Sequence, residues 1–97
     1  MGFDYLYDIS EQPITRFFSF ATDHSRYDFC ILFTNQFQGK SMVICMQTLK
    51  ATLLSANDVD LSFKWPQQLG IASEDLDVLK RFFKNALYST DSLRPQY

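Results

Sequence analysis

The chain has 97 residues, of which 46% are hydrophobic and 16% aromatic, and its formal net charge at pH 7 is −2. This length predicts a single domain over residues 1–97, and the apolar, aromatic composition excludes an intrinsically disordered protein. The acidic balance supplies no general attraction to polyphosphate, and no uncharged apolar run is long enough to cross a membrane.

Residues 1–12 mix acidic and aromatic side chains, and they are predicted to form a short helix or an arm that packs through its aromatic rings. Runs of β-branched and aromatic residues after Pro13 predict four strands. These strands span residues 14–22, 26–34, 41–47 and 52–55. Turn residues separate the first three strands, with His24 in the first turn and Asn35 and Gly39 in the second.

The clearest helix is predicted over residues 73–88, where Ser73 is a suitable N-cap. Its apolar stripe consists of Leu76, Leu79, Phe83 and Leu87. Residues 56–70 are ambiguous, because one helical turn is expected to end at Pro66, and the polar residues 90–97 are predicted to fray. Together these elements predict an α+β fold, in which an antiparallel β-meander of about four strands carries the C-terminal helix on one face.

The strand register is predicted from a four-residue loop over residues 36–39. This register turns six apolar side chains toward the helix: Phe29, Ile31, Phe33, Met42, Ile44 and Met46. The opposite face is half apolar, and its candidates for a dimer interface are Phe17, Ala21, Leu32 and Val43. One helix cannot cover both faces, so we predict a homodimer through this second face or an exposed edge strand, with a contribution from the arm.

Cys30 and Cys45 lie opposite each other in the same register, which suits a redox switch. The other interpretation is a pair of buried, reduced thiols, and a bulge at Gly39 would remove the pairing altogether. His24 is the single histidine, and it lacks the converging ligands of a metal site and the partner of a catalytic base. The sequence therefore predicts no catalytic residue, no metal, no cofactor and no enzymatic activity.

Basic residues near the aromatic strands lead to the hypothesis of a module that binds single-stranded nucleic acid, either RNA or DNA. In such modules cations contact phosphates while aromatic rings stack on bases. The candidates are Arg16, Arg26, Tyr27, Phe37, Lys40 and Lys50. The alternative is a protein-interaction or homodimeric module without nucleic-acid binding, in which a protein partner meets the half-apolar face or the acidic arm.

The segment RYDFCILFTNQFQGKSMVICMQT, followed by TLL, resembles a family of small uncharacterised cytosolic proteins from Gram-positive bacteria (Firmicutes). The resemblance extends from about Phe17 to Leu87. Its most specific parts are Arg26-Tyr27-Asp28-Phe29, the turn from Thr34 to Lys40, and Cys45 with Gln47-Thr48. The resemblance implies a bacterial, cytoplasmic protein with no established enzymatic activity or cofactor, and it implies no functional residues. The acidic N-terminus, which lacks the pattern of a signal peptide, also predicts the cytoplasm.

Overall fold

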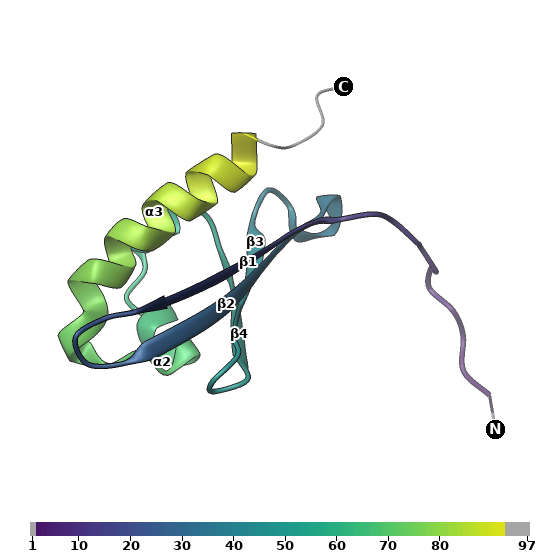
Figure 1. Ribbon diagram of the computed structural model, residues 1–97. Helices are drawn as coiled ribbons and strands as arrows, with labels where there is room; N and C mark the ends of the chain where they lie inside the picture. The colour runs from purple at the N-terminus through teal and green to yellow at the C-terminus, as the bar shows by residue number, and fades with distance from the viewer. Residues whose placement is uncertain (1, 93–97) are drawn as a thin grey trace.

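The computed structural model describes the backbone of residues 2–92 and the side chains as far as Thr90. Four strands form one antiparallel sheet, in which neighbours along the chain are neighbours in the sheet. The strands are β1 (Ile14–Ala21), β2 (Arg26–Phe33), β3 (Ser41–Cys45) and β4 (Lys50–Leu54). The helices are α1 (Asp58–Leu61), α2 (Trp65–Leu69) and α3 (Leu76–Ser92), with short 3-10 turns at Asn35–Phe37 and Ser73–Asp75. The long α3 covers one face of the sheet (Figure 1), which confirms the predicted α+β meander with a C-terminal helix.

Alternation of side chains places the core between the sheet and α3. In β2 every second residue, from Tyr27 to Phe33, is buried, while the residues between them are only partly covered or exposed. Phe18 and Phe20 of β1 pair with this row and pack against the same core. Aromatic rings dominate the contact with the helix: the Phe29 and Phe83 centroids lie 4.9 Å apart. This arrangement confirms the predicted β1–β2 pairing, which turns at residues 22–25.

The predicted register between β2 and β3 is wrong by one residue. The Thr34 side chain accepts a hydrogen bond from the Gln36 backbone N–H at 2.9 Å and starts a 3-10 turn. Gln38 and Gly39 then adopt left-handed backbone angles, so the connection is longer than four residues. Phe33 therefore pairs with Ser41, and every following side chain of β3 changes face.

This shift corrects two residue assignments. Val43 pairs with Ile31 and is completely buried on the helix-covered side, so it does not belong to a dimer face. Cys30 pairs with Ile44, while Cys45 pairs with Phe29. The two cysteines thus lie on opposite faces of the sheet, and the redox-switch interpretation is wrong because the longer connection between β2 and β3 removes their pairing.

The segment after β4 also differs from expectation. Pro66 occupies the first turn of α2 instead of ending a helix, which suits its fixed φ and missing N–H. The indole N–H of Trp65 donates to the Val59 carbonyl at 3.1 Å and fastens α2 to α1 inside the core. The left-handed Gly70 (φ 73°) ends α2.

The start and end of the C-terminal helix lie elsewhere than predicted. Ser73 is part of a 3-10 turn whose N-cap is Ala72, and its hydroxyl donates to the Glu74 carboxylate at 3.5 Å. The helix α3 itself begins at Leu76 and continues to Ser92, which extends it into the segment predicted to fray. The remaining residues of that segment, 93–97, lie outside the described residues.

Candidate functional site: the open face of the sheet

The face of the sheet opposite α3 carries two rows of mostly apolar side chains. Strand pairing sets the rows side by side as Thr15, Leu32, Met42, Leu53 and as Phe17, Cys30, Ile44, Ala51. Phe17 is 76% exposed and Leu53 is 42% exposed, while the residues in the middle strands are half-buried by their neighbours. We call these eight residues the open face. An exposed apolar surface of this kind is typical of a site that contacts another protein, a membrane or a ligand.

Three of the four residues predicted for a dimer interface lie on this side of the sheet: Phe17, Leu32 and Ala21. The fourth, Val43, is buried beneath α3. Sequence reasoning missed Met42, Ile44 and Leu53 as members of the open face. It predicts that Met42 and Ile44 face the helix, and it assigns Leu53 to neither face. Asn35 and Gly39 were the available signal, because together they permit a longer connection than the four-residue loop.

A polar cluster closes one end of the open face. The Asp28 carboxylate accepts hydrogen bonds from Ser19 Oγ and from Gln47 Nε2, the latter at 2.5 Å, and pairs with Arg26 Nε at 3.3 Å. The Ser19 hydrogen bond, helped by Arg26 and Gln47, holds the pKa of Asp28 below its ordinary value. The Asp28 N–H also donates to Gln47 Oε1 at 2.9 Å. These contacts join β2 to the turn after β3, and we call the cluster of Arg26, Asp28 and Gln47 the latch. All three residues belong to the most specific parts of the family resemblance.

The residues predicted to bind nucleic acid do not converge on one surface. Tyr27, proposed to stack on a base, is 4% exposed, and its hydroxyl donates to Asp75 Oδ2 at 2.6 Å. Burial, with the hydrogen bond to Asp75, raises the pKa of Tyr27, while that same hydrogen bond lowers the pKa of Asp75. Tyr27 is therefore a structural residue of the core edge, which corrects its assignment as a stacking side chain.

The basic candidates are separated and mostly engaged. Arg16 Nη1 donates to Ser89 Oγ at 2.7 Å and to Thr90 Oγ1 at 3.1 Å, so it joins β1 to α3. Lys40 Nζ lies 3.0 Å from Asp58 Oδ2, and Arg26 belongs to the cluster around Asp28. The other two candidates are Phe37, half-buried in the turn before β3, and Lys50, exposed at the start of β4.

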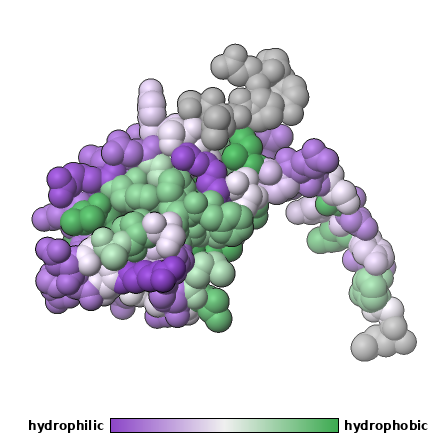
Figure 2. Space-filling model, viewed as in Figure 1, coloured by the Kyte–Doolittle hydropathy of each residue, from purple (hydrophilic) through white to green (hydrophobic). Residues whose placement is uncertain are grey.

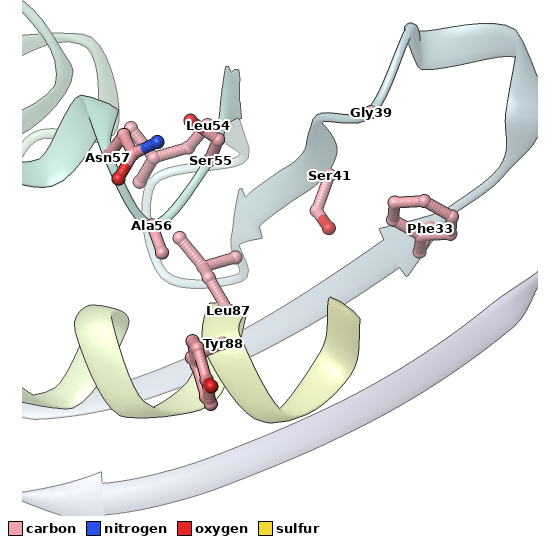
Figure 3. A pocket seen from close by; sticks show the side chains of 9 residues that line it. All are labelled: Phe33, Gly39, Ser41, Leu54, Ser55, Ala56, Asn57, Leu87 and Tyr88. Atoms are coloured by element: carbon pink, nitrogen blue, oxygen red, sulfur yellow. The ribbon is translucent and has the colours of Figure 1, made fainter. Parts of the chain in front are cut away.

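A cavity of about 290 Å³ lies where the ends of β2, β3 and β4 meet α3. Figure 3 shows that Leu87 and Tyr88 line it from the helix, while Ser41 and Phe33 line it from the sheet. None of its nine lining residues is charged, so it offers no acid–base pair. Over the part of the chain that the structure describes, no group of three or more His, Cys, Asp or Glu side chains is placed to hold a metal ion. None of the described helices is both long and apolar enough to pass through a bilayer.

The fold and its open face define a small α+β protein with a single antiparallel sheet covered on one side. Residues 6–85 match the model of the SAV0927-like family. Because this match covers most of the chain, the protein belongs to the SAV0927-like family, a family of uncharacterised small proteins. This membership confirms the predicted resemblance to a family of small uncharacterised proteins. The Gram-positive origin stays a prediction. No curated protein matches the chain significantly.

Proposed function

We propose that the protein is a non-enzymatic, cytoplasmic interaction module that forms a homodimer through the open face of its sheet. The observation that carries this proposal is the composition of that face. Phe17, Leu32 and Ile44 stand on three adjacent strands, on the side that α3 does not cover. Burial of apolar surface contributes about 25 cal/mol per Å², so covering these side chains is favourable.

A second copy of the chain is the partner that fits this face most simply. Two sheets pack face to face at about 10 Å separation when both inner faces are apolar. A twofold axis brings the same surface patch of each copy together, so one apolar face suffices for both partners. The latch around Asp28 then lies at the polar rim, where Arg26 stays hydrated with 72% of its side chain exposed.

Binding of single-stranded nucleic acid stays a prediction without a residue cluster behind it. Its remaining candidates lie apart, with Phe37 in the turn before β3 and Lys50 at the start of β4. Fluorescence anisotropy with labelled single-stranded RNA across a salt series decides this alternative, because phosphate contacts make affinity fall steeply with salt.

Light scattering of three proteins tests the proposed homodimer. The unmodified protein is expected at twice the chain mass of 11.3 kDa, and the Leu32→Asp variant is expected at the mass of one chain. Leu32→Asp puts a charge in the middle of the open face. The matched control is Leu61→Asp, which adds the same charge at a side chain that is 77% exposed in α1 and away from the sheet. It should keep the dimer mass.

Circular dichroism verifies that each variant keeps its fold. A Leu32→Asp variant that remains folded and fully dimeric would contradict the assignment of the interface to the open face.

A further inference from the structure

The N-terminal arm, residues 2–12, has the side-chain pattern of a β-strand. Phe3, Tyr5, Tyr7 and Ile9 occupy alternate positions, with Asp4 and Asp8 between them, and Leu6 is the one departure from the alternation. Such a period of two is typical of a strand with one buried side. The arm is nevertheless exposed, with the Phe3, Tyr5 and Tyr7 side chains 79%, 75% and 70% accessible. The arm thus has an apolar side that the rest of its own chain does not cover.

The sheet offers a free edge that suits an added strand. β1 has a sheet neighbour only on its β2 side. Its eight residues include no proline and no lysine, two residues that commonly block edge pairing, and its single charged residue is Arg16. The other edge, β4, has five residues, begins at Lys50 and is packed by α2. A strand is therefore accepted more readily along β1 than along β4.

An apolar groove runs beside this edge, between β1 and α3. Phe82 of α3 packs against Phe18 and Phe20 with ring centroids 5.0 and 4.6 Å apart, and all three rings stay partly exposed. A hollow of about 250 Å³ opens here, lined by Arg16, Phe18, Phe82, Asn85, Ala86 and Ser89. Figure 2 shows the corresponding hydrophobic surface between α3 and β1, with the arm leaving the body at the right. Side chains from one side of an added strand would fill this groove.

The arm of the same chain points away from the groove. It continues from the first residue of β1 and extends beyond the sheet (Figure 1). The arm is also acidic, because it holds Asp4, Asp8 and Glu11 and no basic residue, while all nine Lys and Arg residues follow it. Arg16, which lines the groove, gives the edge of a second copy the complementary charge.

The open face alone is smaller than the interface of a stable dimer, and the arm would supply the missing area. The open face has a projected area of about 400 Å², estimated from the spacing of strands and residues. A stable dimer buries about 800 Å² per partner, so the face alone provides roughly half. Each buried aromatic side chain contributes about 150 Å² or more, and the three aromatic residues of the arm thus supply about the missing amount.

We propose that residues 3–9 of a second copy add as a fifth strand along the free edge of β1, with their aromatic side in the groove between β1 and α3. The exchange is reciprocal, so each chain of the dimer donates one arm and accepts one arm. This inference rests on the self-association proposed above and names the segment that completes the interface.

Isotope-filtered NMR on a mixture of labelled and unlabelled protein tests the exchange. The expected result is a set of intermolecular contacts between the rings of Tyr5 or Tyr7 and those of Phe18 or Phe82. The dissociation constant of the dimer provides a second readout. Tyr7→Pro removes both the Tyr7 ring and a backbone donor from the added strand and should raise this constant at least about tenfold. Gly2→Pro, outside the alternating pattern, is the matched control and should leave the constant within about twofold.

The outcomes separate this inference from the proposed homodimer. A dimer without intermolecular arm contacts and with an unchanged dissociation constant in Tyr7→Pro would overturn the strand exchange and leave the open-face interface intact. Arm contacts found only within one chain would overturn it as well, because the arm would then fold back on its own sheet. A protein that stays monomeric would overturn both proposals.

Discussion

Arg16 should stabilise the fold, and replacing it with alanine tests this role. Its guanidinium donates to Ser89 Oγ, Thr90 Oγ1 and the Ala86 carbonyl, and it stands 4.6 Å above the Phe18 ring. Hydrogen bonds to a charged group contribute about 1.5–3 kcal/mol, and a cation over an aromatic face adds about 0.5–1 kcal/mol. Thr90 and Ser89 also donate to the Ala86 carbonyl, so neither hydroxyl loses all its partners in the variant.

The expected loss in the free energy of unfolding for Arg16→Ala is therefore about 2–4 kcal/mol. For a domain of this size it corresponds to a fall in melting temperature of roughly 10 °C or more. Urea unfolding followed by circular dichroism measures this loss of stability. The control is Arg81→Ala, which changes an exposed arginine on α3 and should stay within about 0.5 kcal/mol of the unmodified protein. An Arg16→Ala variant as stable as the Arg81→Ala control would refute the clamp between β1 and α3.

Two further predictions concern the register and the response to acid. Val43→Ala removes two buried methyl groups under α3 and should cost about 1.5–3 kcal/mol in urea unfolding, whereas the same change at the exposed Val78 should cost less than about 0.5 kcal/mol. Equal losses at both positions would contradict the observed register. The pKa of the Asp75 carboxyl lies below its ordinary value of 3.8, mainly through the Tyr27 hydrogen bond. The ionised carboxylate therefore stabilises the fold above pH 3.8, and this contribution disappears as the pH falls through the lowered pKa. A pH series of melting temperatures should show this loss, and Tyr27→Phe should weaken the dependence; an identical pH profile in that variant would count against the interaction.

Local patterns in the sequence were sufficient to predict most of the elements. The alternation from Tyr27 to Phe33 and the helical stripe of Leu79, Phe83 and Leu87 both match buried rows in the structure. These patterns work because each depends on residues within one element, where backbone geometry fixes the direction of side chains. The layer arrangement, a sheet with a helix on one face, follows directly from them.

The register between β2 and β3 was not predictable in the same way, because it depends on the length of the connection. Gln38 adopts a left-handed conformation that its residue type does not favour, and the Thr34 side chain supports the turn before it. One residue of difference in this connection exchanged Val43 with Ile44 between the two faces. The pattern of β3 itself does not distinguish the two registers, since both of its sides are largely apolar.

Contacts between distant segments decided which candidate residues are available for binding. The partner of Tyr27, Asp75, lies 48 residues away, and the groups that bind Arg16 lie at least 70 residues away. Sequence spacing gives no sign of either contact. Both side chains therefore looked like surface residues suited to nucleic acid, whereas the structure uses them to join the sheet to the helical segment.

The dimer is tested most directly by sedimentation equilibrium of the unmodified protein over a concentration series from about 1 to 100 μM, the range in which specific protein interfaces associate. Self-association through the open face predicts a mass that rises to twice the chain mass of 11.3 kDa and then stays constant, because a twofold interface closes on itself. A mass of one chain at every concentration would contradict the homodimer.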